Sequence, residues 1–504
     1  MAKLSTSALG IMILTVIGYG IGFLVQVVIA HTLGVGAALD AFVVASIIPE
    51  FIFGITNAIF LTAFVVIFPE YLKQQKEVKP FISTLFTLLT LFLGVCILII
   101  VFFAGFLAKK IAPGFTESQF ALTVLLIRLL SFSIFFFGLS SFMTGILNHE
   151  HHFLVPKATR SIIGIGILIA VFIVMDVTVF TLVFGTIVGI AIVVAIEYVM
   201  LKKKGYSFSF SLDNQTYDSI KSMLSISSPL LCSSVLYYGT KIAMNMFATT
   251  MGEGSVSILN YAFLVSTLPV IFFSGSISST IFPYITKKYV YEKNEEANFI
   301  FVKSLSVLLI VLIPFTILFI MMPTQIIRFL FERGEFTSAS TEAVGKALFY
   351  YSLGILPSGL WASILSIYYA KKKMWKQLIL YVLFFLLSVA FTALFINTLS
   401  YNAIPLAWSI SYWLVVISGG VYVLKKVGID IIKLKKTVFT GIIAASGMAL
   451  FIFTYLLCAT KIPSLQKDVV MVGCIFLSLG IYVGILRLIN AEELDFILNV
   501  LRMS

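Results

Sequence analysis

The sequence predicts an all-α polytopic membrane protein with about fourteen transmembrane helices, and three observations lead to this fold class. Of the 504 residues, 60% are hydrophobic and 11% are charged, whereas a soluble domain has about 25% charged residues. The charges fall in short clusters between apolar runs of roughly 18 residues or more, the length that crosses a bilayer. Segments of the first half also recur later in the chain, which predicts an internal repeat.

The apolar runs place the start of each span to within a few residues. The fourteen spans are expected to begin near residues 8, 40, 81, 121, 158, 180, 219, 256, 298, 343, 377, 403, 437 and 469. The first run, residues 8–30, has no small-residue cleavage site after a short core, so we expect a retained helix and not a signal peptide.

Lys and Arg residues set the orientation of these spans. With the N-terminus inside, the inner segments hold 25 of the 34 Lys and Arg residues and the outer segments hold 7. Because cytoplasmic loops carry the excess of Lys and Arg, both termini are expected in the cytoplasm. The net charge of +12 is assigned to these loops, and no nucleic acid partner is predicted.

The repeat predicts the domain organisation. "HTLGVGAALDAFVVASIIPEFIF" from His31 resembles "TTMGEGSVSILNYAFLVSTLPVIF" from Thr249, and "GFTESQFALTVLLIRLL" from Gly114 resembles "EFTSASTEAVGKALFYY" from Glu335, at offsets of 214 to 221 residues. Six helices separate the copies, so both enter the membrane from the same side. We therefore expect two parallel six-helix lobes, residues 1–217 and 218–432, around a central cavity, followed by two additional helices in residues 433–504.

The second span carries polar residues that cannot face lipid. Glu50 lies about ten residues after Asp40, roughly 15 Å along the helix and near the midplane, and follows a helix-bending proline, Pro49. Glu50, Gly54 and Asn57 share one face because they are spaced i, i+4 and i+7. Ionisable groups at this depth are candidates for function.

The seventh span carries a matching face. Tyr238, Lys241 and Asn245 lie on one side of the helix together with Ser234. Lys241 is near mid-span, so it can meet Glu50 across the predicted cavity. Two interpretations stay open: a water-filled substrate cavity, or a static ion pair that locks two helices.

Other polar groups have competing interpretations. Arg128, in the fourth span, either contacts substrate or extends to the outer interface. Glu197 is expected to pair with the lysines that follow it, near the inner face. The histidines of residues 149–152 are a weak candidate for a metal site. The cysteines, Cys96, Cys232, Cys458 and Cys474, show no metal or disulfide spacing and are expected to be inert packing residues.

No enzyme motif is present in the sequence. A phosphate-binding G-x-x-x-x-G-K-[ST] loop, a nucleophile elbow and a zinc helix motif are all missing. No segment is long enough for a soluble catalytic domain. The sequence therefore predicts a protein without enzyme activity and without a cofactor.

Several motifs together resemble a known family. "LGVGAALDAFVVASIIPEF", "IAPGFTESQFALTVLLIRLL", "GILNHEHHFLVPKA", "GEGSVSILNYA" and "FLFERGEFT" are similar to the MurJ (MviN) lipid II flippases of the multidrug/oligosaccharidyl-lipid/polysaccharide exporter superfamily. The match runs in order from about residue 8 to residue 430. It implies a multi-pass protein of the inner cell membrane that serves peptidoglycan synthesis and cell shape. It also implies alternating access that moves an undecaprenyl-diphosphate-linked glycopeptide from the inner to the outer leaflet, driven by an ion gradient or the membrane potential.

The resemblance has one departure. The family usually places arginines in the cavity from its first, second and eighth spans, where they can meet the diphosphate. The corresponding positions here hold no basic residue: Tyr19, Val25, Phe53 or Gly54, and Leu264. The family's aspartate and fourth-span arginine are kept as Asp40 and Arg128, which leaves Lys241 as the main cation at depth.

Three functions remain open at this point. A flippase for a lipid-linked glycan predicts a cavity lined by Glu50, Asn57, Tyr238, Lys241 and Asn245, with the glycan, membrane lipids and a coupling proton or cation as partners. Its substrate is lipid II or another lipid-linked unit of exopolysaccharide, capsule or O-antigen. The alternatives are a cation-coupled drug exporter and a scaffold that transports nothing.

Overall fold

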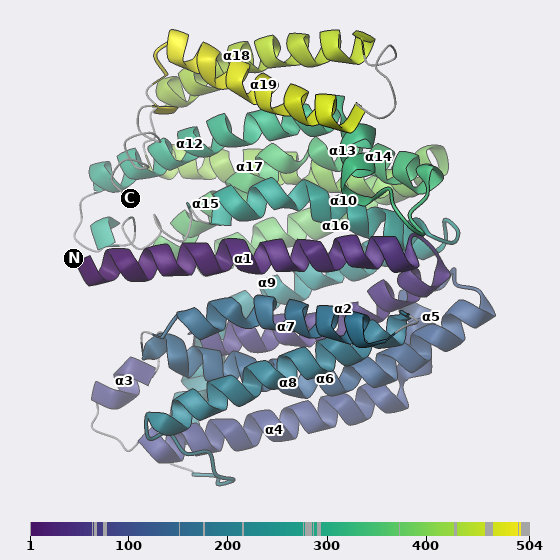
Figure 1. Cartoon of the computed structure of the whole chain (residues 1–504). Helices are drawn as coiled ribbons and strands as arrows, with labels where there is room; N and C mark the ends of the chain where they lie inside the picture. Colours follow the sequence, from purple (N-terminus) through teal and green to yellow (C-terminus); the bar gives the residue numbers. More distant parts are fainter. Residues whose placement is uncertain are drawn as a thin grey trace. The chain divides into compact units, whose positions relative to one another are not determined.

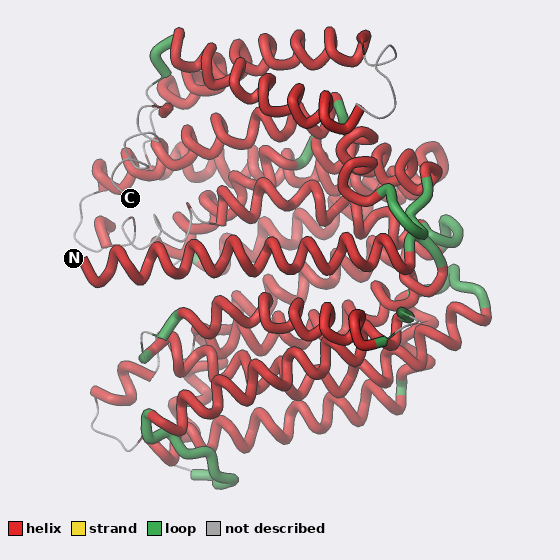
Figure 2. Tube along the Cα trace, viewed as in Figure 1, coloured by secondary structure: helices red, strands yellow, loops and turns green. Residues whose placement is uncertain are grey.

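The computed structural model describes residues 2–62, 64, 68–73, 78–150, 152–174, 177–213, 216–275, 277, 285, 287–289, 294–371, 373–427, 431–458, 467–491 and 493–494. Within these ranges the chain is built of helices joined by short loops, and no strand is found (Figure 2). The all-α fold class predicted from the sequence is therefore confirmed. All fourteen predicted starts lie within six residues of the start of an observed helix.

Eleven described segments are long and apolar enough to cross a membrane, or twelve if the pair Ser338–Ser352 and Ile355–Ala370, bent by 45°, forms one span. One of the eleven, Met374–Val423, contains two helices, and Ala158–Ile173 is a shorter apolar helix. The predicted count of fourteen is compatible with these segments. Their outer faces carry large exposed apolar side chains, such as Phe102 at 84% and Phe172 at 81%, as helices in contact with lipid require.

The chain divides into two compact units. The first comprises Met1–Ser257 with Arg333–Phe336, and the second comprises Ile258–Glu332 with Thr337–Ser504. The seventh predicted span, α9, thus belongs to the first unit. The lobe boundaries predicted from the repeat stay a prediction.

The first unit is a helix bundle (Figure 1). Its helices are α1 (Ala2–Leu33), α2 (Ala37–Thr62), α3 (Phe68–Lys73), α4 (Val78–Phe102), α5 (Ala104–Ile111), α6 (Glu117–His149), α7 (Leu154–Ile173), α8 (Val179–Lys203) and α9 (Tyr217–Thr249). α2 packs on α6 and α9, and α7 packs between α1 and α8. Its core contains Phe60, Phe64 and Phe142, whose ring centroids lie 5.3 to 6.2 Å apart.

α7 and α8 approach each other closely. A Cβ atom on Gly189 would lie 2.8 Å from the Cα of Ile163, and one on Gly185 would lie 2.6 Å from the Cα of Ile167. Glycines four residues apart let the backbones of membrane helices meet, which favours van der Waals packing. This contact fixes α7 against the bundle.

The second unit contains α10 (Ser255–Pro269, whose first turn lies in the first unit), η3 (Val270–Ser274), α12 (Asn294–Met321), α13 (Pro323–Phe331), α14 (Ser338–Ser352), α15 (Ile355–Ala370), α16 (Met374–Leu399), η4 (Ser400–Asn402), α17 (Ala403–Val427), α18 (Ile431–Cys458) and α19 (Lys467–Leu488). α12 packs on α15 and α18. The two additional helices, α18 and α19, are fastened to α12: the Tyr482 hydroxyl donates to the carbonyl of Ile310 at 2.8 Å, and the Thr437 hydroxyl donates to Ser306 at 3.1 Å.

Local features recur at repeated positions of the chain. Thr116 caps α6 and Thr337 caps α14 through the side-chain oxygen. Gly34 and Gly252, each just before a repeated helix, have φ values of +57° and +103°, which L-residues with side chains rarely adopt. These features support the repeat seen in the sequence.

The segment Arg333–Phe336 belongs to the first unit although it lies far along the chain. The Glu335 amide donates to the carbonyl of His31 at 2.9 Å. Gly334, at φ +62°, fits there because a Cβ would lie 2.2 Å from the same carbonyl oxygen. The end of α1 is therefore held by residues from the "FERGEFT" motif.

Candidate functional site

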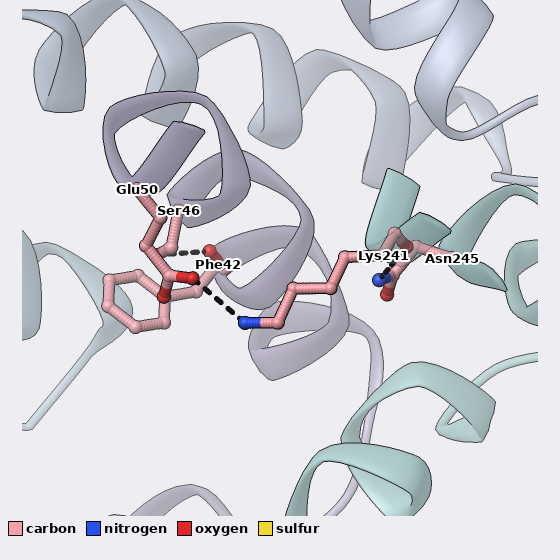
Figure 3. A network of polar contacts seen from close by, with 5 residues as sticks. All are labelled: Phe42, Ser46, Glu50, Lys241 and Asn245. Atoms are coloured by element: carbon pink, nitrogen blue, oxygen red, sulfur yellow. Dashed lines mark hydrogen bonds and ion pairs between the residues drawn. The ribbon is translucent and has the colours of Figure 1, made fainter. Parts of the chain in front are cut away.

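The two polar faces predicted from the sequence meet within the first unit. Lys241 of α9 donates to Glu50 of α2, with Nζ 3.1 Å from Oε2 (Figure 3). The side chain of Lys241 is 27% exposed and that of Glu50 is 52% exposed. This ion pair is the centre of the candidate site.

The exposure of the pair bears on the two interpretations left open by the sequence, a substrate cavity or a static ion pair. An ion pair that solvent reaches contributes about 0–1 kcal/mol, because water and the loss of side-chain entropy offset the attraction. A buried pair needs further hydrogen bonds to offset the desolvation of its two charges. The Glu50–Lys241 pair is part-exposed, and its role in substrate binding stays a prediction.

Aromatic rings surround the ammonium group. Lys241 Nζ lies 5.9 Å from the ring centroid of Tyr237 and 5.8 Å from that of Tyr238, within cation–π range. The Tyr238 ring in turn packs edge-on against Phe51 at 6.1 Å. Space for this ring comes from Gly54, where a Cβ would lie 2.2 Å from Tyr238 Cε2.

The asparagines take different positions. Asn245 Nδ2 donates to the carbonyl of Lys241 at 2.8 Å, so its side-chain amide is hydrogen-bonded to the backbone of its own helix, α9 (Figure 3). Ser46 similarly donates to the carbonyl of Phe42 at 2.8 Å (Figure 3). Asn57 is exposed on α2, one turn beyond Gly54. Roles for Asn57 and Asn245 in substrate binding stay predictions.

Asp40 is buried and both of its carboxylate oxygens accept hydrogen bonds. Oδ2 accepts from the Gly254 amide at 2.6 Å and Oδ1 from the Ser257 amide at 2.7 Å. Gly254 directly precedes α10 and Ser257 lies in its first turn, where N–H groups have no partner within the helix. Asp40 is therefore a helix cap, and a role in substrate binding stays a prediction.

The cap has a counterpart in the repeat. Glu253 Oε1 accepts from the Ala37 amide at 3.2 Å, at the first turn of α2. Each of two repeated helices thus receives a carboxylate from the other repeat copy at its N-terminus, where negative charge is stabilised. Asp40 and Glu253 tie α2 to the start of α10.

Arg128 and Glu197, the other polar groups expected in spans, lie in different surroundings. Arg128 is exposed on α6 and takes part in none of the contacts described around Lys241. The expected pairing of Glu197 with lysines is wrong: its side chain is fully buried, and Oε1 accepts from the Thr144 hydroxyl of α6 at 2.9 Å. Oε2 is buried without a hydrogen bond. Glu197 lies inside the bundle because the face of α8 that carries it packs against α6.

The histidine segment is only partly described. His151 lies outside the described residues, and the His149 ring packs against Phe68 at 4.7 Å. Across the described ranges, no group of three His, Cys, Asp or Glu side chains is arranged to hold a metal ion.

The sequence analysis counts Arg160 only among the cytoplasmic charges and does not predict its contact with Tyr19. Arg160 lies in the second turn of α7, and its guanidinium carbon is 4.6 Å from the ring centroid of Tyr19 on α1. Tyr19 is one of the positions where an arginine was expected. The sequence features that could have indicated this contact are the aromatic residue at position 19 and the arginine near the start of a neighbouring span.

The sequence of the chain is similar to that of known proteins. The family model "Lipid II flippase MurJ" matches residues 29–467. A probable lipid II flippase MurJ of Buchnera aphidicola subsp. Schizaphis graminum is 24% identical over 416 residues, 81% of each chain. A lipid II flippase MurJ of Burkholderia cenocepacia is 24% identical over 360 residues, 68% of this chain and 70% of that one.

Solved structures share the fold. A lipid II flippase MurJ in an inward closed conformation superimposes with a TM-score of 0.81 at 22% identity, over 96% of this chain and 99% of that one. An inward-facing multidrug resistance MATE transporter of the MOP superfamily gives 0.68 at 14% identity, over 83% and 94%. At these identities the likeness concerns the fold.

Proposed function

Because the chain belongs to the lipid II flippase MurJ family, we propose that it moves an undecaprenyl-diphosphate-linked saccharide, a lipid II-like peptidoglycan precursor, from the inner to the outer leaflet. The observation that supports this most directly is the part-exposed Glu50–Lys241 ion pair in two membrane helices. A cation at this depth, paired weakly, suits a substrate that carries a diphosphate.

The pair suggests a cycle of exchange. In the empty transporter Glu50 neutralises Lys241. The diphosphate of the incoming headgroup carries two negative charges, one more than a single carboxylate, and displaces Glu50 from Lys241. The released Glu50 then binds a proton or cation, which helps to return the transporter after the glycan leaves. Tyr237 and Tyr238 hold the ammonium group in place during this exchange.

The remaining parts of the proposal follow the sequence. The protein lies in the inner cell membrane with both termini in the cytoplasm. The repeats, residues 1–217 and 218–432, act as the two lobes of alternating access, and residues 433–504 supply additional helices. Asp40 and Arg128 contribute to substrate binding, and the coupling ion is a proton or cation. No chemical step is catalysed.

A second candidate is favoured by one observation. The positions expected to carry cavity arginines hold Tyr19, Val25, Phe53 or Gly54, and Leu264, and a lysine does not replace the planar, bidentate guanidinium. A transporter with these substitutions suits another polyprenyl-linked unit of exopolysaccharide, capsule or O-antigen. A cation-coupled drug exporter is disfavoured because Lys241 would repel a cationic drug.

The test is rescue of a bacterium depleted of its own lipid II flippase. The wild-type chain is expected to restore growth and the appearance of lipid II in the outer leaflet. Lys241→Arg should retain transport and Lys241→Ala should lose it, because only the former keeps a cation at this depth. Lys202→Ala, at the exposed end of α8, serves as the matched control. Full transport by Lys241→Ala, with equal membrane expression, would contradict the mechanism.

Failure of the wild-type chain to rescue, despite confirmed expression, would shift the substrate to a different lipid-linked glycan. The wild-type chain and its variants are then expressed in hosts depleted of a capsule or exopolysaccharide flippase. Accumulation of the lipid-linked intermediate in the inner leaflet identifies the affected pathway.

A further inference from the structure

We propose that the expected cytoplasmic end of α15, α16 and α17 binds the phosphate group of an anionic phospholipid of the inner leaflet. The basic cluster that binds it consists of Lys371, Lys373, Lys376 and Tyr422, and the acyl chains lie along the exposed faces of α16 and α17. All four residues belong to the second unit, and none takes part in the ion-pair site described above. The inference concerns a lipid that stays bound and not the transported glycan, so it goes beyond the proposed function.

Two lysines of the basic cluster share one phenol oxygen. Lys376 Nζ donates to the Tyr422 hydroxyl oxygen at 3.2 Å, and Lys373 Nζ donates to the same oxygen at 3.5 Å. The Lys376 ammonium group also lies 5.0 Å from the centroid of the Tyr422 ring. A phenol is a neutral acceptor of hydrogen bonds. The repulsion between the two ammonium groups is therefore not neutralised by Tyr422.

The last turn of α15 holds the basic cluster in place. The Lys371 amide donates to the carbonyl of Ile367 at 3.0 Å. The Lys373 amide donates to the carbonyl of Tyr368 at 2.8 Å. The Tyr368 ring stacks on the Tyr422 ring, with centroids 5.4 Å apart and an angle of 18° between the planes. Lys371 and Lys373 are therefore fixed on the same turn that positions the phenol.

The three lysines carry an excess of positive charge. Lys371 Nζ lies 4.8 Å from the ring centroid of Tyr289. Burial lowers the pKa of Lys371, and the charge of Lys373 lowers it further. Among the residues that the structure describes, no carboxylate forms an ion pair with any of the three lysines. An anion bound here neutralises charges that otherwise repel one another.

The N-terminus of α16 makes these charges less favourable still. Lys373 is the N-cap residue of α16 and Lys376 lies in its first turn, which contains no acidic residue. Cations are destabilising at this end of a helix, because it carries partial positive charge. The preference for lysines in cytoplasmic loops explains their presence but not their convergence on one oxygen. A bound anion accounts for the convergence.

The exposed faces of α16 and α17 indicate that the anion is a lipid. On α16, large exposed side chains recur on one helical face at i, i+4, i+7 and i+11, namely at Trp375, Ile379, Val382 and Leu386. α17 packs against α16, and its exposed apolar side chains approach Tyr422 along the chain as Leu414, Ile417 and Val421. Trp375, next to Lys376, is 62% exposed, and tryptophan is enriched at the membrane interface. A phospholipid can contact the lysines through its phosphate while its acyl chains cover these faces.

Net charge distinguishes between phospholipids at this site. Phosphatidylcholine carries a choline cation beside its phosphate, whereas phosphatidylglycerol has a net negative charge. The three lysines attract both phosphates but repel choline, so phosphatidylglycerol should be preferred. Each lysine near an anionic lipid surface changes the affinity by about fivefold.

The experiment uses quenching of tryptophan fluorescence in the full chain, reconstituted in dioleoylphosphatidylcholine bilayers at fixed salt. Phosphatidylglycerol or phosphatidylcholine with brominated acyl chains is titrated in, because bromine quenches nearby tryptophan. Each protein is measured with and without Trp375→Phe, and the difference isolates the signal at the basic cluster. Wild type is expected to bind phosphatidylglycerol about tenfold or more tightly than phosphatidylcholine. The double variant Lys373→Gln/Lys376→Gln should lower this ratio by about tenfold, to near one.

Two further variants and one competitor serve as controls. Lys202→Gln/Lys203→Gln, at the exposed end of α8, removes the same charge at the same expected membrane face and should leave the ratio unchanged. Tyr422→Phe removes the shared oxygen but keeps the ring, and should lower the ratio less than the double variant does. Inorganic phosphate should not displace the lipid. The Tm of the double variant in lipid-free detergent should be at or above that of wild type, because the repulsion between the two lysines is removed.

Four results would overturn the proposal. The first is equal binding of the two phospholipids by wild type, and the second is an unchanged ratio in the folded double variant. The third is an equal loss in the α8 control, which would show that net charge alone attracts the lipid. The fourth is displacement by inorganic phosphate, which would identify a site for a soluble anion. None of these results bears on glycan transport, which the rescue experiment tests separately.

Discussion

Replacing Asp40 with asparagine is expected to destabilise the first unit by about 2–4 kcal/mol. Asp40 is fully buried and its two oxygens accept from the backbone amides of Gly254 and Ser257 at 2.6 and 2.7 Å. Asparagine retains one acceptor oxygen, but its NH₂ group faces the second amide and cannot accept from it. The variant therefore loses one charge-assisted bond of about 1.5–3 kcal/mol and leaves a buried donor unsatisfied.

Two smaller effects act in opposite directions. Loss of the negative charge at the start of α10 removes about 0.3–1 kcal/mol of favourable interaction with the helix dipole. Removing a buried charge also removes part of its desolvation cost, which offsets some of the loss. The net expectation stays within the range of about 2–4 kcal/mol because the unsatisfied amide is the largest contribution.

The assay is thermal unfolding of the purified protein in detergent. For a cooperative unit of the first unit's size, 1 kcal/mol corresponds to about 2 °C, so Tm should fall by about 4–8 °C. Asp218→Asn is the matched control, because Asp218 is an exposed aspartate in the first turn of α9. Its Tm should stay within about 1 °C of wild type. An Asp40→Asn protein as stable as this control would refute the capping argument.

Three more predictions concern packing, a buried acid and pH. Gly54→Ala should lower transport by at least tenfold with normal expression, because the new Cβ would lie 2.2 Å from Tyr238 Cε2 and displace that ring; transport at the wild-type rate would disprove the packing argument. Glu197→Gln should leave Tm unchanged or raise it, since Glu197 has no ion-pair partner among the described side chains and glutamine keeps the bond from Thr144; a fall of more than about 5 °C would show that the charge stabilises the fold. The pKa of Glu150 is lowered from its ordinary value of 4.5 by the Tyr206 hydroxyl and by Lys204, so its contribution to stability is present above about pH 4.5 and is lost as pH falls through the lowered value. The Tm difference between wild type and Glu150→Gln should therefore be constant from about pH 5.5 to 8 and vanish in acid, and a difference that changes near neutrality would contradict this assignment.

Much of the fold follows from hydropathy alone. Each span needs a long apolar run, and the runs end at charged clusters or at residues such as Thr116 and Thr337 that cap the next helix. Helical spacing also identified the face that carries Glu50 and the face that carries Lys241. The meeting of the two faces was expected across a cavity between two lobes, whereas both residues lie in the first unit, because spacing alone does not say which neighbour a face contacts.

The parts that the sequence could not predict depend on how helices rotate against one another. Glu197 lies five residues before a lysine triplet, so a local pair was the simpler expectation, yet packing of α8 on α6 turns it to Thr144. Asp40 was identified by resemblance, but its cap on α10 joins residues more than 200 positions apart. Arg160 needed the neighbouring α1 before its contact with Tyr19 was visible.

The segment Arg333–Phe336 makes the first unit depend on a part of the chain that is synthesised late. Helices α1 to α9 leave the ribosome well before Glu335 is available to donate to His31. Assembly of the first unit during synthesis is therefore incomplete until this segment arrives. A gene divided after α9 would yield an N-terminal fragment that lacks the segment Arg333–Phe336, which holds the end of α1. Such a fragment should become stable only when the remaining fragment is produced in the same cell.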